Sequence, residues 1–516
     1  MTRMAVPITL EPRTAATPRV SSLPAILLPY LPLVLTLIAL ACGIALRGMA
    51  FAADRSLWID EAMLALNILK RSPSELFQPL DHNQGAPLGF LLACKASTGC
   101  FGNGEYALRL PALLASILAL LAFALASKQL LPRPAAQLAL WLFAISPYLI
   151  AYSAECKQYS TDAAASAVLL ALAAGLLNGR AGFWRWVLLA LGGAVAVWFS
   201  HPSLFVMLGL GSALLARAVL GKDRKAVYAV LITGSVWISS FATVYAVNLR
   251  HIGENRYLQD YWAGYFLPFP SKATDLFWIV EKLGQFLAYP GGFAMAVAIP
   301  IFVGIATLAK QRNGKVILTA LLGPFAFALV ASSLQKYPFC GRLLIFLVPM
   351  MILLVASGAA ELAAMIGRNS PAIAALGLAF LILTPAIESR KQLCDPKHAE
   401  ELKPVLRELQ SQWQPGDRLY VYNGSGDAGA GPAFEFYASQ FALPRDRIVL
   451  GGIHRAEPDE YLNEVRAMAP GGRVWFLASH EHRDEVIWLR AYFESIRKPG
   501  PAIVRPGAGA FAYDER

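Results

Sequence analysis

Long apolar runs dominate the first 387 residues of the chain, and short polar segments separate them. A helix needs about 20 mostly apolar residues to cross a membrane, and eleven runs come close to this length. The pattern therefore predicts a multi-pass α-helical membrane protein. The predicted spans are Leu23–Leu46, Glu105–Ser127, Ala135–Tyr152, Thr161–Leu177, Trp186–Ser200, Ser203–Leu220, Ala226–Val247, Gly291–Leu308, Val316–Leu334, Leu343–Ile366 and Pro371–Ile387.

Two segments near the N-terminus are not predicted to span. Leu88–Lys95 is short, which is typical of a helix that lies at the membrane interface. Residues 1–22 are predicted to be disordered. The first apolar run is too long for a removable signal peptide and lacks a cleavage site of small residues. We therefore expect this run to be the first span.

Basic residues collect in alternate turns between the predicted spans, as the positive-inside rule requires of cytoplasmic turns. This places residues 1–22 in the cytoplasm and, because the number of spans is odd, everything after Ile387 on the outer side. The turns also account for part of the net charge of +11, so no nucleic-acid binding is predicted. Their basic residues are Lys128, Arg133, Arg180, Arg185, Lys222, Arg224, Lys225, Lys310, Arg312, Lys315 and Arg368.

Residues 388–516 are more charged and less apolar than the rest of the chain. Strand-like and helix-like runs alternate there, which is typical of a small parallel sheet covered by helices. We expect a soluble α/β domain on the outer side that covers a site or recognises an acceptor. The predicted helices are His398–Trp413, Phe434–Gln440, Asp459–Met468 and Asp484–Ser495, and the predicted strands are Arg418–Tyr422, Arg447–Leu450 and Arg473–Ala478.

The overall composition excludes a soluble protein, because 56% of the residues are hydrophobic, 15% are charged and the mean hydropathy is +0.49. The six cysteines are scattered without the spacing of metal ligands. Cys94 and Cys100 could pair on the oxidising outer side, although buried free thiols are the simpler expectation.

The parity of the spans assigns the chemically distinctive segments to one side of the membrane. Polar groups at membrane depth are costly and usually functional, so the sequence predicts a site at the outer interface. Four predicted outer segments carry acidic, basic and aromatic side chains there: residues 47–104, Ser153–Ser160, Asn248–Pro290 and Gln335–Arg342.

Five motifs in and beside these segments resemble a known family of membrane enzymes. They read, in order, SLWIDEA, HNQGAPLGFLL, GEYALRLPALL, SPYLIAYSAECKQYS and KYPFCGRLLIFLVP. The chain in this respect resembles the polyprenyl-phosphate-sugar-dependent glycosyltransferases of the GT-C fold, which include protein O-mannosyltransferases and the aminoarabinose transferase of lipid A. The resemblance is specific over residues 46–177 and returns at the fifth motif.

The resemblance implies a GT-C transmembrane catalytic domain over residues 23–387, with about 11 transmembrane helices and interfacial helices in the outer loop 47–104. It implies transfer of a sugar from a polyprenyl-phosphate carrier to a hydroxyl of an envelope glycan, lipid or protein, among the lipids of a bacterial inner membrane. A lipid-linked-sugar transporter and an inactive scaffold are the alternatives. A transporter would carry ionisable groups near the middle of interrupted spans and often inverted repeats, and neither is visible.

In enzymes of this family, an acidic residue of the first outer loop is the proposed general base. The matching positions in this sequence are Asp60 and Glu61. Both would lie in the first turn of a helix, where the helix dipole favours negative charge. A carboxylate with a pKa of about 4 is ionised at neutral pH and can accept the proton of the attacking hydroxyl. We expect Asp60 to be this base, and Glu61 to orient the acceptor, bind a divalent cation or pair with a basic residue. Such a single displacement predicts inversion.

The leaving group would be a lipid phosphate, whose growing charge requires fixed cations. Lys157, Lys336 and Arg342 are the candidates, with Arg342 suited to a bidentate contact and Lys157 to a point charge. Relatives tend to carry an acidic residue, a basic residue and a tyrosine in the turn around Lys157. Glu155 and Tyr159 are therefore expected to contribute to the donor site.

His82 and Asn83 match a position where relatives often carry His-Pro-Pro or Lys-Pro-Pro, although Ala86 replaces the first proline here. They are candidates for contact with the acceptor or a metal ion, and a solvated histidine is the simpler expectation. No cofactor is firmly predicted, and a divalent cation is the only candidate. Arg109 is expected to pair with Glu105, four residues earlier.

Three further patterns have simpler explanations. Residues 424–429 match the dinucleotide signature GxGxxG, but the next strand lacks the acidic residue that would bind a ribose. His480 and His482 lack the i, i+4 spacing of a helical ligand pair. The aromatic residues of segment 251–270 suit an interface belt, and the alternative is a mobile cover over the substrate.

Overall fold

The computed structural model describes residues 30–268, 272, 275–395, 400–424, 429–454, 457–468, 471–481 and 483–516. The predicted disordered segment 1–22 and the first residues of the first apolar run lie outside these ranges. Parts of the glycine pattern at 424–429 and residue 482 of the histidine pair also lie outside them.

The chain is a multi-pass helical membrane protein. Among the described residues, eight helical segments are long and apolar enough to cross a membrane, and a ninth consists of two helices bent by 49°. The bend follows from Pro147, which begins the second of the two helices. The segments are α1 (Leu31–Ala52), α4 (Glu105–Leu130), α7 (Tyr159–Leu177), α9 (Ser203–Leu220), α10 (Arg224–Val244) continued by η4 (Tyr245–Leu249) and α11 (Arg250–Glu254), α15 (Gly314–Ser333), η7 (Gly341–Leu347) with α16 (Val348–Gly367), α17 (Pro371–Cys394), and the bent pair of α5 (Arg133–Ala144) with α6 (Pro147–Ala151) and η3 (Tyr152–Ala154).

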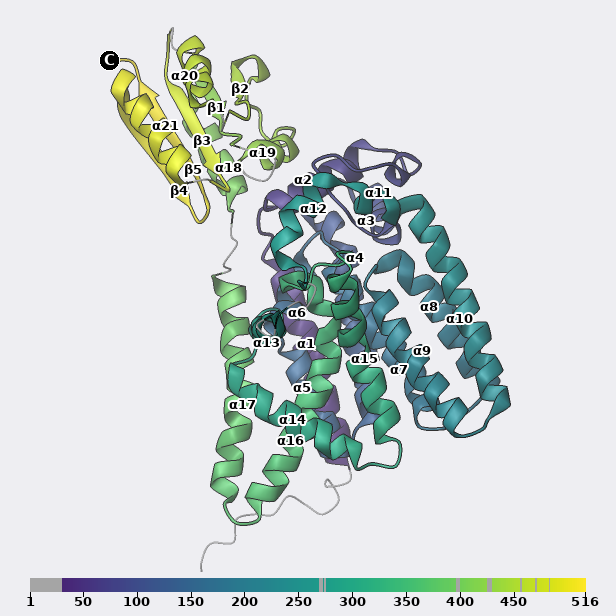
Figure 1. Cartoon of the computed structure of the whole chain (residues 1–516). Helices are drawn as coiled ribbons and strands as arrows, with labels where there is room; N and C mark the ends of the chain where they lie inside the picture. Colours follow the sequence, from purple (N-terminus) through teal and green to yellow (C-terminus); the bar gives the residue numbers. More distant parts are fainter. Residues whose placement is uncertain are drawn as a thin grey trace, which may run out of the picture.

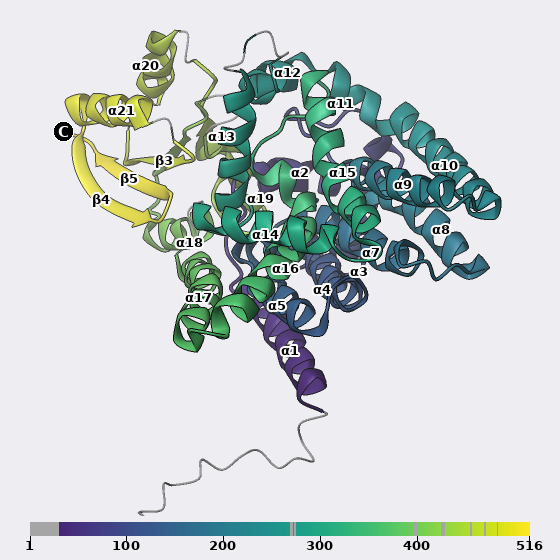
Figure 2. The same cartoon turned by 60° about the horizontal axis from the view of Figure 1, so that its bottom comes forward.

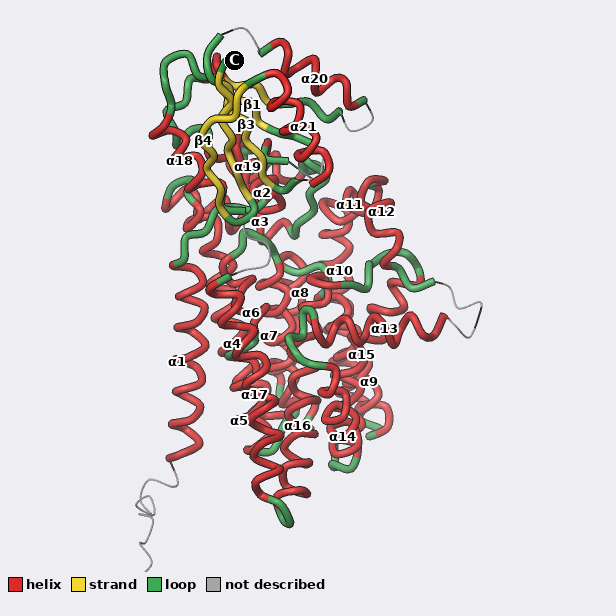
Figure 3. The backbone as a smooth tube through the Cα atoms, turned by 90° about the vertical axis from the view of Figure 1, so that its left-hand side faces the viewer, coloured by secondary structure: helices red, strands yellow, loops and turns green. Residues whose placement is uncertain are grey.

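The other two predicted spans are shorter apolar helices. One is α8 (Phe183–Phe199), and the second is η6 (Met295–Val297) followed by α14 (Ala298–Ala309). The interfacial helix predicted around Leu88–Lys95 is α3 (Leu88–Phe101), which is also an apolar helix shorter than those that could cross a membrane. A further helix, α13 (Asp275–Ala288), lies across the direction of the bundle (Figure 3).

Small residues allow α14 and α16 to approach at backbone distance. A Cβ added at Gly304 would lie 2.1 Å from the carbonyl oxygen of Leu354, and one added at Gly358 would lie 1.8 Å from that of Pro300. Close approach through glycine is a common way for membrane helices to associate, because dispersion contacts replace the hydrophobic effect there. A side chain at either glycine would separate the two helices.

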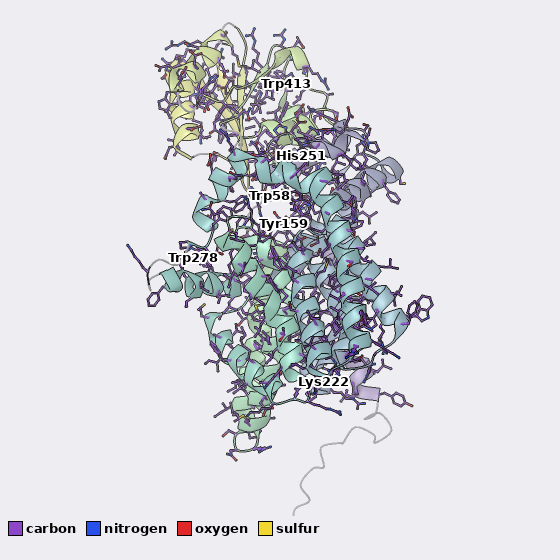
Figure 4. The ribbon with its side chains drawn as sticks, turned by 45° about the vertical axis from the view of Figure 1, so that its right-hand side comes forward. Trp58, Tyr159, Lys222, His251, Trp278 and Trp413 are labelled. Carbon is purple, nitrogen blue, oxygen red and sulfur yellow. The ribbon has the colours of Figure 1, made fainter. Side chains whose placement is uncertain are left out.

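The turns that carry the basic residues meet at one end of the bundle. Asn178 Nδ2, after α7, donates to the carbonyl oxygen of Gln129 near the end of α4 at 2.8 Å. Arg217, near the end of α9, donates to the carbonyl oxygen of Leu177 at 3.2 Å and to Oδ1 of Asn313 at 2.9 Å. Figure 4 shows Lys222 at the same lower end.

The opposite end carries short helices in the segments between spans (Figure 1). They cover the upper end of the bundle, below the C-terminal sheet. Figures 1 and 2 place this sheet on the opposite side of the molecule from α8, α9 and α10. The short elements are α2 (Ile59–Lys70), η2 (Glu75–Phe77), α3, α12 (Arg256–Trp262) and η5 (Ala263–Tyr265).

The C-terminal sheet has five strands in the order β2-β1-β3-β5-β4. Strand β1 runs parallel to β2 and β3, as predicted, but β5 is antiparallel to both β3 and β4. The expected parallel pairing is therefore confirmed for the three predicted strands, but the sheet as a whole is mixed because it also contains the antiparallel hairpin β4–β5. The elements are α18 (Leu402–Gln412), β1 (Arg418–Val421), α19 (Gly431–Tyr437), η8 (Arg445–Arg447), β2 (Ile448–Leu450), α20 (Pro458–Ala467), β3 (Val474–Ser479), α21 (Arg483–Ile496), β4 (Lys498–Arg505) and β5 (Ala508–Asp514).

The missed hairpin has a physical explanation in its composition. Strand β4 contains Pro499 and Pro501, which are usually read as signs of a loop. Prolines are tolerated there because β4 is an edge strand, whose outer side needs no backbone donors. The small residues of β5 weaken the alternation that would otherwise mark a strand.

Candidate active site

An ion pair joins Asp60, in the first turn of α2, to Arg342 in η7. Arg342 Nη2 donates to Asp60 Oδ2 at 2.5 Å, and each side chain is about one quarter exposed. The guanidinium also lies over the rings of Trp58, at 5.0 Å, and of Tyr159, at 5.6 Å. Figure 4 shows these two aromatic residues at the upper end of the bundle, away from Lys222. Arg342 is thus held by a carboxylate and two aromatic faces.

Lys157 adds a second cation near this pair. It is buried, and its Nζ donates to Gln84 Oε1 at 2.7 Å. Burial alone would raise the pKa of Asp60, but the charges of Lys157 and Arg342 outweigh it, and the pKa lies below its ordinary value. Asp60 is therefore ionised at neutral pH. Burial lowers the pKa of Lys157.

Glu61, the neighbour of Asp60 in the chain, is buried in a different hydrogen-bond network. Arg109 donates to its two carboxylate oxygens at 2.9 and 2.7 Å, and the backbone N–H of Cys156 donates to Oε1 at 2.6 Å. Both oxygens are thus occupied in tying α2 to α4 and to the turn before α7. Of the three roles expected for Glu61, the structure shows the pairing with a basic residue, which is Arg109.

The predicted pair between Arg109 and Glu105 is wrong. The Arg109 side chain is committed to Glu61 and to the carbonyl oxygens of the segment before α2. Glu105 instead faces the C-terminal region, where it accepts from Lys403 Nζ at 2.8 Å and from the hydroxyl of Tyr437 at 2.9 Å. Tertiary partners on both sides outweigh the weak pairing of neighbours on one helix.

A group of tyrosines surrounds Glu155 and Arg342. The hydroxyls of Tyr152 and Tyr289 are hydrogen-bonded, and the rings of Tyr152 and Tyr159 lie 4.8 Å apart. Glu155 Oε2 is buried and has no hydrogen-bond partner among the described residues. Burial, and to a smaller extent the charge of Glu61, raises the pKa of Glu155 to about 8. This carboxyl is therefore largely protonated at neutral pH.

Glu155 should make the stability of the protein fall as the pH rises toward about 8. Its pKa of about 8 exceeds the ordinary value of 4.5, so between these values the folded protein holds a proton that the unfolded chain has released. The free energy of unfolding then falls as the pH rises through this window. We expect Glu155→Gln to reduce the fall in the thermal unfolding midpoint between about pH 5 and pH 8. An unchanged pH dependence in this variant would contradict the assignment.

The remaining candidates lie at different distances from this cluster. His82 is exposed, and both His82 and Asn83 have left-handed backbone angles, with φ of 58° and 51°. Asn83 Oδ1 accepts from Asn255 Nδ2 at 3.1 Å, next to α12. The Lys336 side chain is exposed and makes no hydrogen bond or ion pair with the described part of the chain. The structure thus does not bring Lys336 into contact with Asp60.

All four segments that were assigned to the outer side meet at this place. The first meets the second through Gln84 and Lys157, and it meets the fourth through Asp60 and Arg342. The third joins the fourth where the backbone N–H of Phe339 donates to the carbonyl oxygen of Tyr265 at 2.9 Å. Residues hundreds of positions apart therefore form one polar cluster at the end of the bundle opposite the basic turns.

Sequence reasoning missed Lys282, on α13. Its Nζ lies 5.6 Å from the ring centre of Tyr265 and 5.7 Å from that of Trp278. Its charge, like that of Arg342, opposes the rise in the pKa of the Cys340 thiol that burial causes. Lys282 is thus a third cation beside the cluster. Its place in an amphipathic helix within the third outer segment was the available signal.

The described residues do not gather a metal site, since no three side chains of His, Cys, Asp or Glu come together among them. Both oxygens of Glu61 are occupied, and Asp60 faces a cation. These two carboxylates therefore do not fit a divalent cation in this arrangement.

The cysteines are free thiols. Cys94 and Cys100 lie six residues apart on one helix, α3, with Cys94 buried and Cys100 exposed. Disulfide geometry requires Cα atoms within about 7 Å and converging side chains, and this pair does not meet that need. The proposed pairing of the two is therefore excluded.

No family model and no curated protein matches the chain, whereas solved structures match over most of its length. ArnT from Cupriavidus metallidurans bound to undecaprenyl phosphate is 14% identical, with a TM-score of 0.52 over 93% of this chain and 97% of that one. The oligosaccharyltransferase of Archaeoglobus fulgidus in the apo form is 12% identical, with a TM-score of 0.54 over 94% and 74%. The archaeal oligosaccharyltransferase AglB from Archaeoglobus fulgidus, in complex with an inhibitory peptide and a dolichol-phosphate, has a TM-score of 0.51 and 12% identity over 94% of this chain and 74% of that one. The resemblance predicted from the motifs is confirmed at the level of the fold, and this chain has the GT-C fold.

Proposed function

We propose that the chain is a glycosyltransferase that moves a sugar from a polyprenyl-phosphate carrier to an acceptor hydroxyl, with Asp60 as general base. The observation that carries the proposal is the ion pair of Asp60 with Arg342, beside the buried Lys157, within the GT-C fold. An ionised carboxylate next to cations is the combination that proton abstraction and a departing phosphate require.

The unused hydrogen-bonding capacity of the ion pair supports this assignment. Arg342 has five N–H donors, and among the described residues only Nη2 is occupied, by Asp60. Asp60 Oδ1 likewise accepts no hydrogen bond from that part of the chain. Arg342 can therefore bind a phosphate while it keeps Asp60 in place, and Asp60 retains one oxygen for the acceptor hydroxyl.

The proposed reaction is a single displacement. The acceptor oxygen attacks the anomeric carbon, its proton passes to Asp60, and the bond between the anomeric carbon and the phosphate oxygen breaks. The electron pair of that bond stays with the polyprenyl phosphate, whose added charge is stabilised by Arg342 and Lys157. The anomeric configuration is inverted, because the acceptor arrives on the face opposite the leaving group.

An apolar cavity offers room for part of the lipid carrier. It has a volume of about 210 Å³ and lies between α14, α16 and α17, with Phe293 and Ala294 among its lining residues. Four residues before Phe293, Tyr289 is hydrogen-bonded to Tyr152 in the cluster around Arg342. A prenyl chain that leaves the phosphate beside Arg342 could therefore follow this segment into the cavity.

The proposed location is a bacterial inner membrane, with the site on the outer, periplasmic side. The separation of the basic turns from the cluster supports this orientation, because basic turns favour the cytoplasmic side. The acceptor would be an envelope glycan, lipid or protein, and the C-terminal region would lie on the same side as the site.

The function is tested with the purified protein in sealed proteoliposomes, a panel of polyprenyl-phosphate sugars and an envelope extract as acceptor. Release of polyprenyl phosphate together with labelled acceptor would support transfer. Movement of the donor between leaflets without release would support a transporter. Binding of donor with neither outcome, for every sugar tested, would support an inactive scaffold.

Arg342 provides a sharper test of the phosphate site. We expect Arg342→Met to lower the transfer rate about 10²-fold, as loss of one oxyanion contact does elsewhere, and to weaken binding of polyprenyl phosphate. Arg342→Lys should recover only part of both, because lysine cannot make a bidentate contact. Arg368→Met, an exposed cation at the far end of α16, is the control and should behave as wild type. Unchanged binding in Arg342→Met would contradict the assignment.

A further inference from the structure

The C-terminal region is attached to the segment that leads into α2 by several hydrogen bonds. Ser56 Oγ donates to Glu401 Oε2 at 3.2 Å, and the backbone N–H of Leu57 donates to the hydroxyl of Tyr437 at 2.8 Å. Lys403 Nζ bonds Asp54 Oδ2 at 2.9 Å. Hydrophobic residues of the two parts also share one buried cluster. The region is therefore packed directly against the helix that carries Asp60.

Glu400 contacts the residue that precedes Asp60 in the chain. Its Oε2 accepts the backbone N–H of Ile59, the first residue of α2, at 2.9 Å. Its Oε1 is hydrogen-bonded to Nδ1 of His480, and the Glu400 side chain is buried. The residue that should cap the helix, Trp58, supplies no side-chain acceptor. A carboxylate more than 300 positions away thus satisfies one of the first four backbone N–H groups of α2, which have no partner within the helix.

We propose that Glu400 is a positioning residue for Asp60: it fixes the first turn of α2 from the C-terminal region, and His480 orients its carboxylate. The inference rests on the proposed function. Ile59 and Asp60 are adjacent, so a shift of this turn moves the base carboxylate relative to the donor. The backbone of His480 is left-handed, with φ of 48°, a conformation that persists only where the surroundings impose it.

Three substitutions at Glu400 separate the effect of side-chain length from the effect of side-chain charge. Glu400→Gln keeps the length and an oxygen acceptor but removes the charge, whereas Glu400→Asp keeps the charge and withdraws the oxygen by one methylene. Glu400→Ala removes both. If positioning depends on reach, glutamine should restore more activity than aspartate. The control is Glu435→Gln, which breaks the exposed Lys70–Glu435 bridge between the same region and the last residue of α2.

Two readouts are measured on the full-length protein in nanodiscs. One is turnover, resolved into kcat and the KM for donor, because misplacement of a base by about 1 Å can cost about 10²-fold in rate without loss of donor binding. The second is hydrogen exchange of the Ile59 amide, which reports the hydrogen bond to Glu400 without any need for turnover. We expect Glu400→Ala and Glu400→Asp to lower kcat at least about 10-fold with donor KM retained, and to speed the exchange.

The control and Glu400→Gln should remain close to wild type in both readouts. If the Ile59 amide exchanged faster in Glu400→Ala and Glu400→Asp while kcat stayed at the wild-type value, Glu400 would have only a structural role. If the exchange were unchanged in these variants, Glu400 would not hold the Ile59 amide. Either result overturns the inference. If Glu400→Ala does not fold, the comparison of Gln with Asp decides. A wild type that turns over no donor, with exchange still dependent on Glu400, would contradict the proposed function and leave the anchoring of α2 intact.

Discussion

Asp60→Asn is expected to lower sugar transfer by about 10²- to 10⁴-fold, the range that loss of a general base produces. Asparagine has nearly the same shape as aspartate and can still accept a hydrogen bond from Arg342, but it cannot accept a proton from the acceptor. Binding of polyprenyl phosphate should therefore persist. Initial rates of polyprenyl phosphate release, with binding measured separately, test this expectation.

Asp81→Asn is the matched control for this substitution. Asp81 lies in the same outer segment, and its side chain is exposed at 69%, where it pairs only with Arg71 among the described residues. We expect this variant to keep the wild-type rate. If Asp60→Asn also kept it, the base would have to be sought elsewhere. Loss of donor binding in Asp60→Asn would indicate a folding defect or a binding role.

Replacement of Glu61, the carboxylate next to Asp60, should mainly lower the stability of the fold, whereas replacement of Asp60 should mainly lower the rate of transfer. Glu61→Leu leaves the buried guanidinium of Arg109 without its partner, and removal of one member of a buried ion pair typically costs about 3–5 kcal/mol. We expect a large fall in the thermal unfolding midpoint and in the yield of folded protein. Asp60→Asn, whose carboxylate is partly exposed, should lose much less stability.

A double substitution distinguishes ion pairing from a simple loss of packing. Glu61→Leu combined with Arg109→Met removes both charges, so no buried charge remains unpaired, and the double variant should unfold at a higher temperature than Glu61→Leu alone. Additive losses would mean that the pair contributes little. Full stability of Glu61→Gln together with loss of transfer would assign the base to Glu61.

Most of the spans could be predicted from the sequence because polar residues mark their ends. The span Ser203–Leu220 has the same limits in the prediction and in the structure, since Pro202 immediately precedes it and Gly221 immediately follows it. The third span differs because Pro147 bends it, which the apolar pattern alone does not record. The short helix α14 also departs from the predicted span, whose first residues, from Gly291, precede its helical part.

The site was less predictable than the spans, because its contacts are formed between distant segments. Asp60 and Arg342 were both candidates, but 282 positions separate them and no local rule joins the two. The assignment of Arg109 to Glu105 was wrong because a local rule was applied where tertiary partners were stronger. The contact of Glu400 with Ile59 could not be foreseen, since it depends on how the C-terminal region packs.

The most direct test of the proposed function is release of polyprenyl phosphate from a labelled polyprenyl-phosphate sugar by the purified wild-type protein and by Asp60→Asn. The proposal predicts release by wild type that matches the label gained by the acceptor, with inverted anomeric configuration, and at most about 1% of that rate in the variant. Equal release by both proteins would contradict Asp60 as the base. No release by wild type from any donor of the panel would contradict the proposed activity itself.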